Sequence, residues 1–336
     1  NKLIENNILL FAKCPEHNPK HLNHSKYTLS LIEHDYSAKT PVMWNTVYEK
    51  WEIECVNVMF VGDVANIHKI FNALKKDKRY IGGGMGVGFK DKALEILDKV
   101  DTTAGKIGSV NFVLKNEKKE LVGYNTDGEG YSTSLENLFK KQGEKLSGKK
   151  VVMIGAGGTG RAIAFSLAKK GMKIVILNRS VDAAEKLAKD ISSHLSFDDE
   201  KVLFGDEEKI ASEVKDADVI LNVSTKGSSG TLEGYSPLAP AKIPATKDNV
   251  IENLKLAEKI LCGLPKNIIM SDIVLREIQT PFLESAQREG FEILSGVPMV
   301  VNQGVEALWF LHGNELVNKG VTKKEVYDVM KKAAGL

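Results

Sequence analysis

The sequence is poor in cysteine and contains no long apolar run. Its three cysteines, Cys14, Cys55 and Cys262, are too few and too scattered for a disulfide framework, which favours a reducing compartment. No apolar run reaches the roughly 18 residues of a membrane span, and the opening NKLIENNILL lacks the cationic and then apolar build of a signal peptide. We therefore expect a cytoplasmic protein with no membrane partner. The first residue is Asn1, which leaves open a segment removed upstream.

An excess of one charge is also absent, because 46 Lys and Arg residues face 44 Asp and Glu residues and the formal net charge is +2. Nucleic-acid binding depends on a basic field that this balance does not supply, so we expect a small-molecule partner and no nucleic acid. The 336 residues are 43% hydrophobic and 27% charged, which is typical of a globular chain with room for two domains. Disorder and fibrous structure are excluded.

A βαβ unit begins near the middle of the chain. The apolar run of residues 151–154 ends in a glycine cluster, residues 161–170 place apolar side chains along one helical surface, and residues 173–177 form a second apolar run. Such a unit implies a parallel sheet with a right-handed crossover. Helix and strand patterns alternate as far as residue 294, so we predict a doubly wound, Rossmann-type domain over residues 128–296.

The first part of the chain predicts a second α/β domain. Strand and helix patterns are mixed here, at residues 27–32, 40–51, 55–60, 64–77 and 109–114. We predict a domain over residues 27–127, completed by two C-terminal helices in residues 297–336 and preceded by an extension over residues 1–26. The predicted fold class is therefore α/β, with a cleft between this N-terminal domain and the Rossmann-type domain.

The strongest local signal is the run Gly155-Ala156-Gly157-Gly158-Thr159-Gly160, a G-x-G-x-x-G that follows a strand and opens a helix. Gly155 permits the tight turn, Gly157 lets a pyrophosphate approach the backbone, and Gly160 allows close packing of helix on sheet. The pattern alone is weak. Its place in a βαβ unit favours nucleotide binding over a purely structural turn.

The residues that follow the second strand of this unit, Asn178-Arg179-Ser180, indicate which nucleotide is bound. Sites for NAD carry an acidic residue here for the ribose 2′-hydroxyl, whereas an arginine favours the 2′-phosphate of NADP. We therefore expect NADP. Asp182 lies nearby and keeps NAD as an alternative, and an exposed strand-end arginine without a ligand is the other interpretation.

Two further features carry polar groups suited to chemistry. The segment Gly123-Tyr124-Asn125-Thr126-Asp127-Gly128 lies at the predicted domain junction, where ligands bind preferentially. Lys90 follows a run with five glycines in residues 82–88, which predicts a mobile loop. A lysine after such a loop is, taken alone, a surface residue.

Together these motifs resemble those of shikimate dehydrogenase and its quinate/shikimate relatives, over roughly residues 27–336. GYNTDGEG at residues 123–130 is similar to the family's G-x-N-T-D-x-x-G, and GAGGTGRA followed by NRS resembles its glycine loop and N-R-T. Shorter matches occur in the family's order at Gly108-Ser109-Val110-Asn111, Asn222-Val223-Ser224 and Asn302-Gln303-Gly304-Val305-Glu306.

The resemblance implies that Lys90 and Asp127 form the catalytic pair of an NADP-dependent oxidoreductase that interconverts 3-dehydroshikimate and shikimate, or the quinate pair. The implied substrate ligands are Thr40, Asn111 and Gln303, and the implied cofactor ligands are the loop Gly155 to Gly160, Asn178, Arg179, Ser180, Asn222 and Ser224. The domain over residues 27–127 would then bind substrate and the one over residues 128–296 would bind NADP. No metal is implied, and the family acts in chorismate and aromatic amino acid biosynthesis. We expect a monomer or a homodimer.

The implied chemistry agrees with these residue types. Hydride delivery to a ring ketone leaves an alkoxide that must be protonated as it forms. A lysine ammonium group can supply that proton, and a neighbouring carboxylate can orient the lysine and bind an adjacent hydroxyl.

The sequence departs from the family pattern at Ala38, Gly86 and Leu275, which replace a Ser, a Thr and a Tyr that bind substrate. These positions belong mainly to the carboxylate-binding half of the site, so a different cyclic polyhydroxy acid or an amino analogue is an alternative substrate. Lys39 or Lys226 could replace the lost ligands, although a solvated surface lysine is the simpler interpretation of each. A sensor that binds NADP and catalyses nothing is the remaining alternative.

One cluster has no counterpart in the family pattern: Cys14, His17, His21 and His24. These residue types can bind zinc, but their spacing fits no standard motif. We therefore expect a polar N-terminal extension and no metal.

Overall fold

The computed structural model describes residues 2–13, 24–35, 38–86, 88–195, 201–276 and 279–335. The chain divides into two compact units: unit 1 comprises Asn1–Gly130 and Val300–Leu336, and unit 2 comprises Tyr131–Met299. Both divisions fall inside helices, α5 (Asp127–Lys141) and α11 (Val297–Asn318). The predicted boundaries, 127/128 and 296/297, lie at the first turns of the same two helices.

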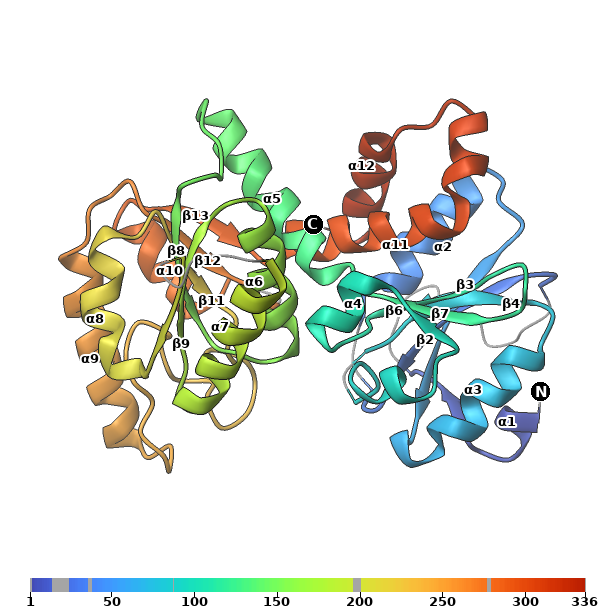
Figure 1. Cartoon of the computed structure of the whole chain (residues 1–336), viewed down its shortest axis with the longest axis horizontal. Coiled ribbons are helices and arrows are strands. Elements are labelled where there is room, and N and C mark those ends of the chain that lie inside the picture. Colours follow the sequence, from blue (N-terminus) through green and yellow to red (C-terminus); the bar gives the residue numbers. More distant parts are fainter. Residues whose placement is uncertain are drawn as a thin grey trace. The chain divides into compact units, whose positions relative to one another are not determined.

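Unit 1 is built on a seven-stranded mixed sheet with the strand order β1-β3-β2-β4-β6-β7-β5 (Figure 1). The strands are β1 (Leu9–Phe11), β2 (Tyr27–Ile32), β3 (Val56–Gly62), β4 (Tyr80–Gly84), β5 (Lys99–Val100), β6 (Phe112–Lys115) and β7 (Leu121–Tyr124). The helices are α1 (Lys2–Glu5), α2 (Thr40–Lys50), α3 (Ile67–Lys76), α4 (Thr102–Ile107) and α12 (Lys323–Ala333), with 3₁₀ turns η1 (Val64–Asn66) and η2 (Lys92–Glu95).

Apolar periodicity explains how helices cover both faces of this sheet. In α3 the buried residues Ile67, Ile70, Phe71 and Leu74 recur at the helical spacing and pack into a core with α1, α4, η2 and the sheet. Helices α2, α11 and α12 share a second core that includes Phe112 of β6. The predicted C-terminal helices therefore complete the fold of unit 1.

The glycine run before Lys90 is where the structure differs most clearly from the prediction made from the sequence. Gly82, Gly83 and Gly84 do not form a mobile loop; they belong to β4, between β2 and β6 in the middle of the sheet. A Cβ atom at Gly83 would lie 1.9 Å from the carbonyl oxygen of Leu29, so only glycine allows β4 to approach β2 this closely. The prediction failed because glycine carries no apolar side chain to mark a strand.

The segment predicted as an N-terminal extension contributes structure to unit 1. Its strand β1 pairs antiparallel with β3, joining Leu9 to Gly62 and Phe11 to Phe60. Cys14, His17 and His21 lie outside the described residues. Within the described ranges, no group of His, Cys, Asp and Glu side chains is arranged to hold a metal ion.

Unit 2 contains a six-stranded sheet in the order β10-β9-β8-β11-β12-β13, with every neighbouring pair parallel. The strands are β8 (Lys150–Ile154), β9 (Lys173–Leu177), β10 (Val202–Gly205), β11 (Val219–Asn222), β12 (Ile269–Asp272) and β13 (Glu292–Ser295). The helices are α6 (Gly158–Lys169), α7 (Val181–Leu195), α8 (Ile210–Glu213), α9 (Lys247–Cys262) and α10 (Pro281–Arg288), with 3₁₀ turns η3 (Glu207–Lys209) and η4 (Val214–Asp216).

Helices lie on both faces of this parallel sheet (Figure 1). Helices α8, α9 and α10 share one core with the sheet, and α6 and α7 lie on the opposite side. This strand order is that of a doubly wound, dinucleotide-binding fold, so the predicted α/β class is confirmed. Among the helices of the described ranges, none has the length and apolar character needed to cross a membrane.

Candidate active site

Lys90 and Asp127 form an ion pair in unit 1. The Nζ atom of Lys90 lies 2.6 Å from Oδ2 of Asp127, and the two side chains are 25% and 8% exposed. Lys90 comes from the turn before η2, and Asp127 is the first residue of α5. The carboxylate is therefore buried, while the lysine side chain is partly exposed.

Asn111 holds the second oxygen of this carboxylate. Its side-chain amide donates to Oδ1 of Asp127 at 2.8 Å and to Oγ1 of Thr126 at 3.0 Å. The Asn111 side-chain oxygen accepts a hydrogen bond from the backbone N–H of Thr126 at 2.8 Å. Both oxygens of Asp127 thus have a fixed donor, so the carboxylate orientation is set before any ligand arrives.

Gln303 joins the same cluster from α11. Its Oε1 lies 3.4 Å from the amide nitrogen of Asn111 and 3.4 Å from the hydroxyl oxygen of Thr126. Its own amide donates to the carbonyl of Val300 at 3.0 Å, which fixes the side chain. The sequence did not single out Thr126 as a site residue, although it lies inside the quoted segment between Tyr124 and Asp127.

Backbone hydrogen bonds between neighbouring segments position these side chains. The N–H of Val110 donates to the carbonyl of Lys90 at 2.9 Å, and the N–H of Asn111 donates to the carbonyl of Tyr124 at 3.0 Å. The N–H of Met85, just after β4, donates to the carbonyl of Asn111 at 2.7 Å. The Lys90 turn is therefore tied to the sheet that carries the other polar groups.

The remaining expected substrate ligand is not joined to this cluster. Thr40 begins α2 and is half-buried. In the described part of the chain, no hydrogen bond links it to Lys90, Asn111 or Gln303. Ala38 packs beside the apolar residues Ala12, Ile32 and Met59. Where the family has hydroxyl groups, this segment therefore presents an apolar contact and one threonine.

The glycine loop of unit 2 has the shape that dinucleotide binding requires. Gly155 has a φ of +117°, and a Cβ there would lie 2.8 Å from the backbone nitrogen of Ser224. A Cβ at Gly160 would lie 2.9 Å from Val223, which shows the close packing expected of the third glycine. Gly157 is the N-cap of α6, and a Cβ there would meet no atom within 4 Å. The space beside the N-cap of α6 is therefore open.

The segment after β9 lies beside the end of β10. The N–H of Asn178 donates to the carbonyl of Gly205 at 3.1 Å, and its side-chain amide donates to the carbonyl of Ser180 at 2.9 Å. Arg179 and Ser180 are exposed, so the guanidinium group is accessible to an anionic ligand. Asp182 is exposed in the first turn of α7.

Asn222 organises the loop after β11. Its side-chain oxygen accepts from the backbone N–H of Ser224 at 3.1 Å and from the Ser224 hydroxyl at 2.7 Å. Its amide donates to Asp272 Oδ1 at 3.0 Å. Asp272 was not among the predicted site residues; burial raises the pKa of its carboxyl to about 7, against the effect of hydrogen bonds from Val274, Thr280 and Asn222.

The structure contradicts both interpretations of Lys226, as a replacement substrate ligand and as a solvated surface lysine. Lys226 is neither a solvated surface lysine nor free to bind a substrate carboxylate, because its Nζ lies 2.9 Å from Oε2 of Glu207 and its side chain is 2% exposed. The two residues come from different strand ends, after β11 and after β10, and the sequence spacing gave no indication of this pairing.

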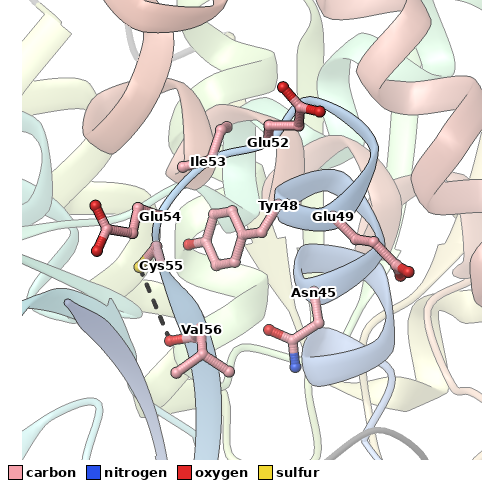
Figure 2. A pocket seen from close by; sticks show the side chains of 8 residues that line it. All are labelled: Asn45, Tyr48, Glu49, Glu52, Ile53, Glu54, Cys55 and Val56. Atoms are coloured by element: carbon pink, nitrogen blue, oxygen red, sulfur yellow. Dashed lines mark hydrogen bonds between the residues drawn. The ribbon is translucent and has the colours of Figure 1, made fainter. Parts of the chain in front are cut away.

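A separate pocket of about 450 Å³ lies between the end of α2 and the start of β3 (Figure 2). It is lined by Asn45, Tyr48, Glu49, Glu52, Ile53, Glu54, Cys55 and Val56. Burial raises the pKa of the Cys55 thiol to about 11, so the thiol stays protonated at neutral pH. None of the residues of the Lys90 cluster lines this pocket.

Comparison with known proteins identifies relatives that match most of the chain. The family model described as shikimate / quinate 5-dehydrogenase matches residues 137–232, and the shikimate dehydrogenase substrate binding domain matches residues 33–113. The shikimate dehydrogenase (NADP(+)) of Methanococcus vannielii is 30% identical over 276 residues, which is 81% of this chain and 85% of that protein. That of Methanopyrus kandleri is 32% identical over 290 residues, or 84% and 88% of the two chains. A crystal structure of a shikimate dehydrogenase in complex with NADP⁺ matches with a TM-score of 0.73 and 25% identity, over 92% of this chain and 94% of that one.

Proposed function

The chain belongs to the shikimate and quinate dehydrogenase family, and we propose that it interconverts shikimate and 3-dehydroshikimate by hydride transfer with NADP, using Lys90 and Asp127 as its acid–base pair. The protein is an oxidoreductase of this family, and its relatives are shikimate dehydrogenases (NADP(+)). The observation that carries the proposed site is the 2.6 Å ion pair of Lys90 with a carboxylate whose other oxygen is held by Asn111.

The bound nicotinamide supplies or accepts the hydride. In the reductive direction Lys90 donates a proton to the oxygen that becomes the alcohol, and in the oxidative direction it takes that proton back. Asp127 directs the lysine, because its Oδ2 atom lies 2.6 Å from Nζ of Lys90. Such acid–base assistance contributes roughly 10²–10⁴-fold to the rate.

The substrate hydroxyl groups are assigned to the polar surface around this pair. Asn111 and Gln303 present amide groups 3.4 Å apart, and Thr126 contributes a hydroxyl to the same surface. Thr40 is proposed as a ligand at the carboxylate end of the substrate, from the first turn of α2. We therefore assign substrate binding to unit 1.

NADP binding is assigned to unit 2. The first turn of α6 offers N–H groups to the pyrophosphate beside the open position of Gly157, and Ala156, Gly158 and Thr159 complete this loop. The exposed Arg179, flanked by Asn178 and Ser180, would hold the 2′-phosphate. Asn222 and Ser224 would line the cofactor site from the loop after β11. NAD remains the alternative cofactor. The monomeric or homodimeric state and the cytoplasmic location stay predictions.

A related cyclic polyhydroxy acid, or an amino analogue, is the second candidate substrate. The carboxylate end supports it, because Ala38 lies in an apolar contact and Leu275 is 53% exposed, so neither supplies the hydroxyl group found in the family. Quinate is the first alternative to test, since it differs from shikimate within the same chemical class.

The deciding experiment measures initial rates of NADPH and NADH formation with shikimate and with quinate. The variants are Lys90→Ala and Asp127→Ala, and the control is Lys92→Ala, an exposed lysine two positions away that pairs with Glu95 at 3.9 Å. We expect both site variants to lose about 10²–10⁴-fold in turnover and the control to keep it.

Two results would overturn the proposal. Full turnover in either site variant would remove the substituted residue from the chemistry and so overturn the proposed pair. Absence of turnover with both acids, in a protein that binds NADP, would exclude the shikimate and quinate reactions. It would favour a different cyclic acid or amino analogue as substrate, or a sensor that binds NADP and catalyses nothing.

A further inference from the structure

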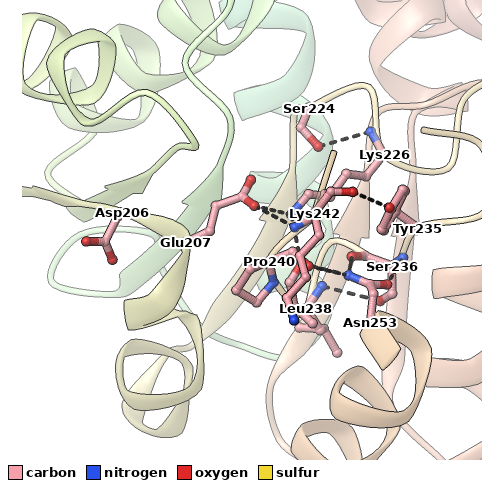
Figure 3. A network of polar contacts seen from close by, with 12 residues as sticks. Asp206, Glu207, Ser224, Lys226, Tyr235, Ser236, Leu238, Pro240, Lys242 and Asn253 are labelled. Carbon is pink, nitrogen blue, oxygen red and sulfur yellow. Dashed lines mark hydrogen bonds and ion pairs between the residues drawn. The ribbon is translucent and has the colours of Figure 1, made fainter. Parts of the chain in front are cut away.

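A buried ion pair lies at the carboxyl edge of the unit 2 sheet, where the cofactor is proposed to bind. Lys226 Nζ and Glu207 Oε2 are 2.9 Å apart, with side chains 2% and 9% exposed (Figure 3). Lys226 also donates to the carbonyl of Ala239 at 2.8 Å, and Glu207 Oε2 accepts from the N–H of Ala241 at 3.1 Å. Two buried charges are costly unless they satisfy each other in this way.

Three charged residues gather at this edge because parallel strands end together there. Arg179 follows β9, Glu207 follows β10 and Lys226 follows β11. The hydrogen bond from Asn178 to Gly205 fixes the first two segments side by side. Burial lowers the pKa of Lys226, the charge and hydrogen bond of Glu207 raise it, and the positive charge of Arg179 lowers it.

We propose that Lys226 is a specificity-determining residue for the cofactor: by neutralising Glu207, it lets Arg179 hold the 2′-phosphate that distinguishes NADP from NAD. This inference rests on the proposed NADP-dependent function. An acidic side chain near the end of the second strand selects NAD, because it binds the free 2′-hydroxyl and repels a phosphate. Glu207, one strand away, would act in that direction if it were left unpaired.

The formal charges predict how each substitution changes the preference for NADP over NAD. With Arg179 and Lys226 positive and Glu207 negative, the three groups sum to one positive charge. Loss of the Lys226 charge reduces the sum to zero, and loss of the Glu207 charge raises it to two. Figure 3 shows Asp206 pointing away from the pair.

The loop that carries Lys226 has anchors that do not depend on its side-chain charge. The backbone N–H of Lys226 donates to the Ser224 hydroxyl at 3.2 Å, and its carbonyl accepts from the amide of Asn222 at 3.0 Å. A change confined to the ammonium group therefore leaves the backbone of the loop in place, so charge and structure can be tested separately.

The test measures dissociation constants of NADP and NAD by calorimetry, without substrate. The variants are Lys226→Met, Glu207→Gln and the double variant, and the control is Lys242→Met, whose exposed lysine pairs with Glu252 at 2.7 Å. For Lys226→Met we expect NADP binding to weaken by about tenfold relative to NAD. Glu207→Gln should raise the preference for NADP, and the double variant should return close to the native ratio. Lys242→Met should leave the ratio unchanged.

Equal weakening of both cofactors in Lys226→Met and Glu207→Gln would reduce the pair to a structural contact and overturn the inference. If Lys226→Met does not fold, Glu207→Gln and the double variant still decide, because the inference requires a higher NADP preference in the former. A native protein that binds neither cofactor would instead refute the proposed function. If the native enzyme turns over shikimate and the variants keep its ratio of NADP to NAD affinity, this inference alone is refuted.

Discussion

Replacing Gly83 with alanine should destabilise unit 1 far more than an ordinary glycine substitution. The added Cβ would lie 1.9 Å from the carbonyl oxygen of Leu29 and 2.6 Å from its backbone nitrogen, whereas real Cβ atoms essentially never come closer than 3.0 Å to such atoms. β2 and β4 would have to separate by about 1 Å, which breaks hydrogen bonds in the middle of a sheet. Each buried backbone group left unpaired costs about 1–3 kcal/mol.

Two such unpaired groups would lower the free energy of unfolding by about 2–6 kcal/mol. The φ of +155° at Gly83 adds strain for any residue with a side chain. We therefore expect Tm to fall by about 10 °C, since 1 kcal/mol corresponds to about 2–4 °C in a unit of this size. β4 is followed along the chain by the Lys90 turn, and Met85, just after β4, donates a hydrogen bond to the carbonyl of Asn111. Activity should therefore fall together with stability.

The assay is thermal unfolding followed by far-ultraviolet circular dichroism, with Gly105→Ala as the matched control. Gly105 lies inside α4, and a Cβ there would meet only a side-chain carbon of Val100 at 4.0 Å. The control should gain about 0.5–1 kcal/mol, because alanine is the better helix former. A Gly83→Ala protein that unfolds within 2 °C of the native one would refute the argument that β4 needs glycine for its close approach.

Two further predictions concern single polar contacts. Asn111→Leu removes the donor to Asp127 Oδ1 while keeping the number and branching of the side-chain heavy atoms, so kcat/KM with shikimate should fall by about 10–10²-fold with an unchanged dichroism spectrum. An unchanged kcat/KM would show that Asp127 needs no such support. Asp272 has its pKa raised by burial from 3.8 to about 7. Between these two values the unfolded chain releases the proton and the folded chain retains it, so the free energy of unfolding falls as pH rises, by up to about 4 kcal/mol, and the loss is complete above pH 7. Urea unfolding at pH 5 and pH 8 should therefore show a smaller difference for Asp272→Asn than for the native protein, and equal differences would contradict the assignment.

The sequence predicted unit 2 better than unit 1 for a physical reason. Strand β8 is a short buried apolar run followed by glycines and a helix, so every signal for a βαβ unit lies within one stretch of about 30 residues. The mixed sheet of unit 1 pairs segments that are distant in sequence, and its edge strand β1 and central strand β4 carry weak local patterns. Local periodicity therefore missed both strands.

Local sequence patterns also could not predict which site residues come together. The contact between Asn111 and Gln303 spans 192 positions, so no spacing rule could bring the two together. Their association was expected only from the family resemblance. Lys226 stands in a stretch of serine, threonine and glycine that is typical of a solvated loop, and its burial depends on a carboxylate from another strand end.

The antiparallel pairing of β1 with β3 has a consequence for shortened forms of the chain. Leu9, Leu10 and Phe11 cover the outer edge of β3, and the ring of Phe11 lies 4.6 Å from that of Phe60. Unpaired edge strands recruit other chains, because their free N–H and C=O groups form a template for a further strand. A form that starts after Phe11 would expose such an edge, so it should self-associate or aggregate even where the proposed catalytic residues are intact.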